Sequence, residues 1–235
     1  MLLETTNLRK NFGKIVAMDG LDFRLEAGDI RAIIGPNGAG KTTFFNLLTG
    51  TLPVDEGTIR FKDTDITDEG VAEIAQMGMI RKYQTPSVFE ELTIKEHFNI
   101  AANPSRLSDP ERRKQWAIDQ VNLGDRLDDK AGSLDHGNKQ WLEIGMILAA
   151  DPELLLLDEP TAGMTVEETK KTTDLIKRLN EEDNLSVITI EHDLEFVRNL
   201  QSPVTVLHQG KNVAEGTINE IEEDAYVQQI YIGED

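Results

Sequence analysis

The stretch that decides the fold is residues 35–42, which read Gly35-Pro36-Asn37-Gly38-Ala39-Gly40-Lys41-Thr42 and are followed by Thr43. They fit the phosphate-binding pattern G-x-x-x-x-G-K-[ST] and come directly after the apolar run at residues 30–34. Glycines let such a loop curl, so that backbone N–H groups converge on a phosphate at the positive end of the next helix. We expect Lys41 to reach the β- and γ-phosphates of a nucleotide and the Thr42 hydroxyl to bind Mg²⁺.

A second segment carries two acidic residues at the end of an apolar run. Residues 154–157 are four leucines, and Asp158 and Glu159 follow them. An unbroken apolar run is typical of a strand covered on both faces, and ligands bind beyond the carboxyl ends of strands in open α/β sheets. We therefore expect Asp158 to hold Mg²⁺, directly or through water, and Glu159 to orient and deprotonate an attacking water.

Several other segments read as strands. Residues 187–190 form another mostly apolar run without alternation, which predicts a further buried parallel strand. Alternating apolar and polar residues at 20–26 and 58–61 predict half-buried strands, and residues 204–207 and 212–214 predict a closing hairpin. Buried strands so far apart in the sequence need helical crossovers, so the fold class is α/β with a parallel sheet.

The middle of the chain, residues 86–150, changes to a helical pattern. Thr93 with Glu96, and Ser108 with Glu111, both match the capping box that begins many helices. We therefore expect this segment to be a mostly helical insert between the two halves of the α/β core.

Composition excludes several classes of protein. The 235 residues include 24 basic and 43 acidic residues, which give a net charge of −19 and disfavour a protein that grips nucleic acid through a basic face. No cysteine is present, which excludes disulfides and thiolate metal sites. No apolar run approaches the roughly 20 residues that span a bilayer, and the N-terminus lacks the pattern of an export signal. We expect a cytoplasmic chain whose membrane role, if any, comes through partners.

The acidity itself has two interpretations. A well-solvated acidic surface resists self-association, and a chain from a salty cytoplasm is also rich in surface carboxylates. Circular dichroism in dilute buffer and in molar KCl distinguishes these two hypotheses.

Taken together, the chain resembles an ABC-type ATP-binding subunit along its whole length. Beyond the two segments above, the resemblance rests on motifs in the family's order: Phe12, Gln84 after residues 81–83, a signature-type segment at Leu134, Asp135, His136, Gly137 and Asn138, a D-loop at residues 162–165, and His192 after residues 187–190. The resemblance implies that ATP and Mg²⁺ are the cofactors. It also implies a P-loop NTPase (RecA-like) core with an antiparallel β layer in residues 1–85 and 151–235, and a helical subdomain in residues 86–150, all within one ATP-binding domain, 1–235.

The resemblance also implies roles for single residues. Phe12 is expected to stack on adenine, and residues 35–43 and Asp158 to hold the nucleotide. Gln84 is expected to meet the attacking water, Mg²⁺ and the membrane subunits, and His192 to contact the γ-phosphate. Glu159, His192 and Gln84 are thus the expected catalytic residues, and Thr42, Gln84 and Asp158 the expected metal ligands.

Three positions depart from the family's pattern. Asp135 replaces the signature serine, Asn138 the usual glutamine, and Thr165 the usual D-loop aspartate. The signature serine meets the γ-phosphate of ATP bound to the opposite subunit, where a carboxylate is repulsive. At about 4 Å and an effective dielectric constant near 20, each like-charge pair costs about 4 kcal/mol. We hypothesise an asymmetric pair, in which this chain's own site hydrolyses ATP and the site completed by Asp135 is weak.

Within the family, the chain looks most like the branched-chain amino acid and urea/amide importer group. Residues 81–93, 139–146 and 162–169 are similar to the urea branch in particular, and residues 227–233 resemble the tail of the whole group. Urea or short amides are the favoured cargo, with branched-chain amino acids as the alternative. Such importers combine two different ATP-binding subunits, two membrane permease subunits and an extracytoplasmic solute-binding protein. This chain is then peripheral on the inner face of the cell membrane and binds no nucleic acid.

Two interpretations from other classes remain open. A soluble ABC ATPase acting on the ribosome or DNA usually carries paired ATPase modules or a basic face, and this chain has neither. A non-catalytic regulatory nucleotide-binding partner is suggested by Asp135 and disfavoured by the presence of Glu159 and His192.

Overall fold

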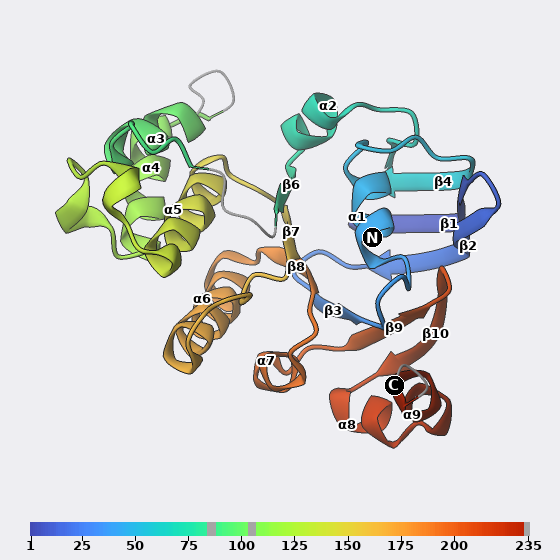
Figure 1. The fold of residues 1–235 in the computed structure, drawn as a ribbon. Coiled ribbons are helices and arrows are strands. Elements are labelled where there is room, and N and C mark those ends of the chain that lie inside the picture. The colour runs from blue at the N-terminus through green and yellow to red at the C-terminus, as the bar shows by residue number, and fades with distance from the viewer. Residues whose placement is uncertain (84–87, 103–106, 233–235) are drawn as a thin grey trace.

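The computed structural model describes residues 1–83, 88–102 and 107–232, and its strands form two sheets (Figure 1). One sheet has six strands in the order β10-β9-β3-β8-β7-β6, and the other has four in the order β2-β1-β4-β5. The strands of the larger sheet are β3 (Ile30–Ile34), β6 (Met79–Lys82), β7 (Leu154–Asp158), β8 (Ser186–Ile190), β9 (Val204–His208) and β10 (Lys211–Gly216). Those of the smaller sheet are β1 (Leu3–Phe12), β2 (Ile15–Leu25), β4 (Glu56–Phe61) and β5 (Thr64–Asp65).

The six-stranded sheet confirms the predicted parallel core. Strand β3 pairs in parallel with β8 and β9, and β7 pairs in parallel with β6 and β8, while β10 closes the edge as an antiparallel hairpin with β9. Successive leucines of β7 enter opposite hydrophobic cores: Leu155 and Leu157 pack in one, Leu154 and Leu156 in the other. Both faces of the strand are therefore buried, which is why its sequence shows no alternation.

The four-stranded antiparallel sheet contains a strand that the sequence did not predict. Strand β1 pairs with β2 and β4, and its register shifts between Thr5 and Leu8 and again at Arg9. These irregularities break the strict alternation of apolar and polar residues, so the period-two signal is lost. Strand β2 also begins at Ile15, earlier than the predicted segment 20–26.

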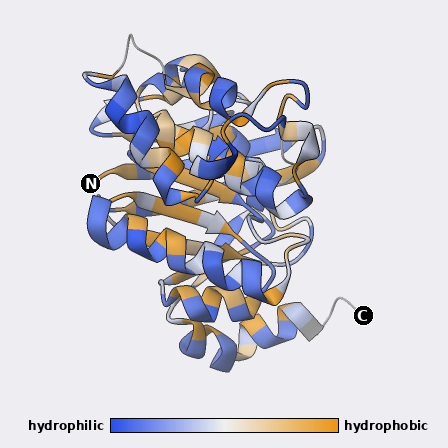
Figure 2. Cartoon of the chain, turned by 90° about the vertical axis from the view of Figure 1, so that its left-hand side faces the viewer, coloured by the Kyte–Doolittle hydropathy of each residue, from blue (hydrophilic) through white to orange (hydrophobic). Residues whose placement is uncertain are grey.

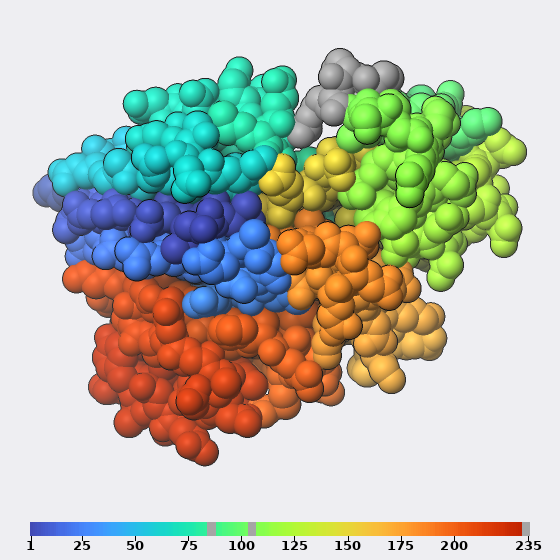
Figure 3. Space-filling view, turned by 180° about the vertical axis from the view of Figure 1, so that it is seen from behind, coloured from blue at the N-terminus to red at the C-terminus, as the bar shows by residue number. Residues whose placement is uncertain are grey.

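The helices of the middle segment cluster at one side of the molecule (Figure 1). Those within residues 86–150 are α3 (Ile94–Ala101), α4 (Pro110–Gln120), α5 (His136–Ala149) and two short 3₁₀ turns, Gly124–Arg126 and Ala131–Ser133. The remaining helices are α1 (Lys41–Leu48), α2 (Val71–Gln76), α6 (Val166–Asp183), α7 (Leu194–Leu200), α8 (Ile218–Glu223) and α9 (Ala225–Ile232). From behind, the middle segment forms a lobe beside the core (Figure 3).

Helix caps decide where two of these helices begin. The capping box predicted at Thr93 is confirmed, since its side chain accepts a hydrogen bond from the Glu96 N–H and Glu96 bonds back to the Thr93 N–H. The box predicted at Ser108 is wrong. Asp109 is the N-cap of α4, and its carboxylate accepts a bond from the Arg112 N–H. Asp is as good an N-cap as Ser, and Pro110 then occupies the first turn, where its missing N–H costs nothing.

Hydrophobic residues line the strands and the inner sides of the helices, and the outer helix faces are hydrophilic (Figure 2). The middle segment has a tightly packed centre. A Cβ added at Gly145 of α5 would lie 2.7 Å from the Phe98 ring of α3, so only glycine lets these two helices approach so closely. This packing fixes α5 rigidly against α3 within the middle segment.

Candidate functional site

The phosphate loop lies between β3 and α1, as the sequence predicts, and two of its glycines are required by their surroundings. Gly40 has a φ of +105° and caps α1, and a Cβ there would lie 2.6 Å from the Ala17 carbonyl oxygen. At Gly35 a Cβ would lie 2.1 Å from the Leu207 carbonyl oxygen. The loop is thus held against β2 and β9, with the N-terminus of α1 at its end.

The Lys41 side chain folds back over this loop. Only 7% of the residue is exposed, and its ammonium donates hydrogen bonds to the carbonyl oxygens of Gly35 (2.5 Å) and Pro36 (2.9 Å). Thr42 is exposed beside it and Thr43 is half-buried. The loop therefore presents a cation and a hydroxyl at a helix N-terminus, which together suit a phosphate group.

Asp158 ends β7 and is 93% buried, and its carboxylate pairs with the guanidinium of Arg81 on the neighbouring strand β6. Arg81 is also held by the side-chain oxygen of Asn46 on α1, at 2.6 Å. Sequence reasoning missed Arg81 as a site residue. Arg81 lies near the carboxyl end of β6, and Asp158 ends the neighbouring strand β7. The sequence does not reveal that these two strands pair, so it could not bring the two residues together.

Oxygen donors for Mg²⁺ are present. The Thr42 hydroxyl and the Asp158 carboxylate are hard ligands, and Mg²⁺ is usually held by one or two carboxylates together with substrate phosphates rather than by an all-protein cage. Within the described ranges, no three His, Asp or Glu side chains gather into a metal cage. These residues fit the ion; Gln84, the third predicted ligand, lies outside the described residues.

Glu159 and His192 lie together beyond the ends of β7 and β8. The Nε2 atom of His192 lies 3.0 Å from a carboxylate oxygen of Glu159, and both side chains remain partly exposed. Glu159 has a φ of +47°, and its N–H bonds to the Ile190 carbonyl oxygen at 2.9 Å. A non-glycine residue in this region is strained and is often found at functional sites. The strained turn holds a carboxylate at the edge where Lys41 also lies.

A buried acid next to His192 was not predicted. Glu191 is 3% exposed, and its carboxyl accepts hydrogen bonds from the Thr161 hydroxyl (2.8 Å), the Thr161 N–H (3.3 Å) and the His192 N–H (3.3 Å). Burial raises the pKa of Glu191 to about 7, although these donors favour the charged form. Glu191 thus joins the turn before α7 to the turn after Glu159.

Glu191 should make stability depend on pH. Its pKa is raised on folding from 4.5 to about 7, so its contribution is complete below pH 4.5 and is lost as the pH rises through 7. We expect the unfolding free energy of the wild type to fall by about 3 kcal/mol from this group between pH 4.5 and pH 8. The isosteric Glu191→Gln removes this component. Urea unfolding of both proteins across this range tests it, and identical pH dependence of the two would contradict it.

The signature-type segment begins α5, and its two unusual residues bind each other. Asp135 is the N-cap, and its carboxylate accepts bonds from the Asn138 N–H (2.8 Å) and from the Asn138 side-chain amide (2.8 and 3.0 Å). The backbone hydrogen bond from Asn138 lowers the pKa of Asp135, with the Asn138 side chain adding to the effect. Asp135 is therefore a firmly ionised cap at the start of this helix.

The remaining predicted residues have clear places. Phe12 ends β1 and is 46% exposed, with the Lys10 ammonium 5.8 Å from its ring centre. Thr165, the departure in the D-loop, caps α6 through a capping box with Glu168. His136 is exposed at the start of α5, beside Gly137. Among the helices that the structure describes, none is long and apolar enough to cross a membrane.

The chain is similar in sequence and in structure to known ATP-binding proteins of transporters. The family profile described as ABC transporter matches residues 18–162. The chain is 34% identical to the high-affinity branched-chain amino acid transport ATP-binding protein BraF of Pseudomonas aeruginosa and 32% identical to LivG of Escherichia coli, each over 99% of this chain and 98% of the relative. A nucleotide-free ATP-binding cassette from an ABC transporter superposes with a TM-score of 0.89 at 32% identity, over 99% of both chains, and so does an ADP conformation of such a cassette.

Proposed function

This chain belongs to the ABC transporter family as an ATP-hydrolysing cassette, and we propose that it drives an importer of branched-chain amino acids. The cassette itself never touches the cargo, so the proposal about cargo rests on relatives that cover almost the full length of the chain. We expected urea or short amides from the sequence. The relatives favour the alternative, and urea stays as a second candidate because of residues 139–146 and 162–169.

We propose the following roles for the chain's own residues. Residues 35–42 bind the phosphates, with Lys41 turning from its own loop carbonyls to the β- and γ-phosphates. Glu159 orients the water that attacks the γ-phosphorus and accepts its proton, and ADP leaves as the bond to the bridging oxygen breaks. His192 holds Glu159 and contacts the γ-phosphate. Mg²⁺, held by Thr42 and Asp158, would neutralise charge on the phosphates.

We further propose that the chain works in an asymmetric pair. The Asn138 N–H at the start of α5 is a group that would meet a γ-phosphate on the opposite subunit, and it already donates to the Asp135 carboxylate. The contact between Asp135 and Asn138 explains how two departures from the signature occur together. A second, non-identical ATP-binding subunit with a serine in its signature would complete this chain's site, beside permease subunits and an external solute-binding protein.

Substituting Asp135→Ser in the assembled transporter should raise total ATP turnover by up to about twofold, because removing the like charge restores the weak site beside one that already works. Serine keeps a good N-cap, so the stability of α5 should hardly change. The matched control is Asp109→Ser, the same exchange at the N-cap of α4. Turnover that stays at the wild-type rate in Asp135→Ser would show that Asp135 does not oppose a nucleotide.

The cargo is tested in the same assembly. The transporter, reconstituted in vesicles with its binding protein, should show ATP turnover stimulated by leucine, isoleucine or valine. Stimulation by urea or short amides instead would reverse the order of the two candidates.

A further inference from the structure

Helix α5 carries two buried polar side chains on the face that meets the core. Gln140 has no exposed surface, and Glu143, one turn later, is 8% exposed. Most neighbouring residues on this side are apolar, so polar groups are costly there unless they are paired. Both residues reach across to the core, and we call their contacts the α5 seam.

The first contact of the α5 seam is an ion pair. The carboxylate of Glu143 lies 3.3 Å from the ammonium of Lys82, which is the last residue of β6 and has no exposed surface. The same ammonium donates to the Tyr83 carbonyl oxygen at 3.2 Å. A buried ion pair seldom adds stability over an apolar pair of the same volume, whereas it does fix geometry. The pair is therefore better explained by a positional role than by added stability.

The second contact joins α5 to the D-loop. The Gln140 side-chain nitrogen lies 3.1 Å from the Ala162 carbonyl oxygen and 2.9 Å from His136 Nε2. Within the described part of the chain, the Gln140 side-chain oxygen accepts no hydrogen bond. The amide nitrogen thus ties the start of α5 to the D-loop, while the buried oxygen without a partner costs stability.

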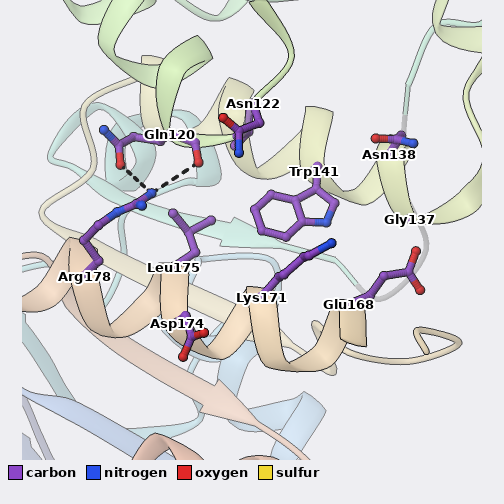
Figure 4. Close-up of a pocket in the computed structure, with 11 residues that line it drawn as sticks. Gln120, Asn122, Gly137, Asn138, Trp141, Glu168, Lys171, Asp174, Leu175 and Arg178 are labelled. Carbon is purple, nitrogen blue, oxygen red and sulfur yellow. Dashed lines mark hydrogen bonds between the residues drawn. The ribbon is translucent and has the colours of Figure 1, made fainter. Parts of the chain in front are cut away.

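Toward α6, the first turns of α5 border a cleft (Figure 4). This cleft of about 430 Å³ separates Trp141 and Asn138 of α5 from Lys171 and Asp174 of α6. It is bridged by exposed hydrogen bonds from Arg178 of α6 to Gln120 at the end of α4. Helix α5 is therefore less closely packed toward α6 than toward α3, where Gly145 meets the Phe98 ring, and the seam is the contact that fixes its position against the core.

Strand β6 ties the seam to the catalytic residues. Arg81 and Lys82 are consecutive and point to opposite faces of the strand, as the period of two requires. Arg81 pairs with Asp158, and Lys82 pairs with Glu143. The strand therefore holds the proposed metal ligand with one side chain and the signature helix with the next.

We propose that Lys82, Glu143 and Gln140 are positioning residues, and that the α5 seam sets the angle at which residues 134–138 are presented to the opposite subunit. The positioning of residues 134–138 follows from the structure alone. The proposal rests on the proposed function only in taking a nucleotide on the opposite subunit as the group that these residues contact. Directional hydrogen bonds define an angle that non-directional apolar contacts leave free.

The test replaces the ion pair by apolar residues of similar size, Lys82→Met with Glu143→Leu. Removing one partner alone, as in Lys82→Met, leaves a buried carboxylate and should lower Tm by about 10 °C, while the double variant should stay within a few degrees of the wild type. Gln140→Leu is a second route that creates no unpaired charge. The control is Lys62→Met with Glu153→Leu, which removes an exposed ion pair elsewhere.

The primary readout is the distance between spin labels on α6 and on the helical lobe. The chain contains no cysteine, so cysteines introduced at the exposed Asp128 and Glu182 are the only labelling sites. One narrow distance distribution is expected for the wild type and the control. A broader or shifted distribution is expected for the double variant and for Gln140→Leu. An unchanged distribution in both would overturn the proposal, whatever the function of the chain.

The second readout separates positioning from simple stability. A fluorescent ATP analogue should bind the double variant with the wild-type Kd, because residues 35–42 are untouched. ATP turnover with the partner subunit should fall at least about tenfold, in kcat rather than in KM. Normal turnover despite a changed distance would also overturn the proposal. A wild-type assembly that fails to hydrolyse ATP would instead refute the proposed function, and the spin-label distances would still decide the seam.

Discussion

The Glu159→Gln variant is expected to bind ATP with the wild-type Kd and to hydrolyse it about 10²- to 10⁴-fold more slowly, the range that a positioned general base contributes. Glutamine keeps the shape and the hydrogen bond toward His192 but cannot accept the proton of the attacking water. Glu159 is partly exposed at the edge of the site, so the exchange should leave the fold and the phosphate loop unchanged. Single-turnover kinetics of the assembled pair measures the effect.

The matched control for this exchange is Glu153→Gln, at the opposite end of the same strand. Glu153 is exposed and pairs with Lys62, far from the phosphate loop, so its exchange should leave turnover unchanged. A Glu159→Gln variant with near-normal turnover would mean that another group takes the proton, and the proposed role of Glu159 would be wrong.

The second large effect is expected for Lys41→Met, which should weaken ATP binding by about 10²-fold or more. Two charge-assisted hydrogen bonds to phosphate oxygens would be lost, each worth about 1.5–3 kcal/mol. In the structure the ammonium is already aimed into the loop, where it donates to the Gly35 and Pro36 carbonyl oxygens. Isothermal titration with Mg²⁺-ATP measures the change.

Lys95→Met, the same exchange at an exposed residue of α3, is the control for Lys41→Met. Circular dichroism of both variants shows whether the fold is kept, because Lys41 is buried and Lys95 is not. If a folded Lys41→Met variant bound ATP as tightly as the wild type, residues 35–42 would not be the phosphate site.

Much of the fold could be predicted, because its main signals are local. The apolar runs at β3, β7 and β8 and the loop between β3 and α1 identify a parallel α/β core without any knowledge of pairing. Strand β1 and the short C-terminal helices α8 and α9 were missed. The strand is interrupted by bulges, and helices of six and eight residues span at most about two turns, in which apolar residues repeat too few times to reveal a helical pattern.

The site residues likewise fall into those that local motifs reveal and those that only strand pairing brings together. Short motifs were enough to single out Lys41, Asp158 and Glu159 as site residues. The structure brings these three residues to one edge of the sheet. The pairs Arg81–Asp158 and Glu191–Thr161 could not, since their members lie 77 and 30 positions apart and meet only through strand pairing. Asp135 shows a third case: its departure was visible in the sequence, but its bond to Asn138 was not.

We infer that the chain has a complete ATP site and a signature segment that resists a second nucleotide. Size-exclusion chromatography with light scattering of Glu159→Gln tests it most directly, with and without Mg²⁺-ATP. Low and high salt are both needed, because a net charge of −19 on each chain also opposes association. We predict a particle of 26.3 kDa that binds ATP but stays monomeric under all conditions. An ATP-dependent dimer of the chain with itself would contradict the claim.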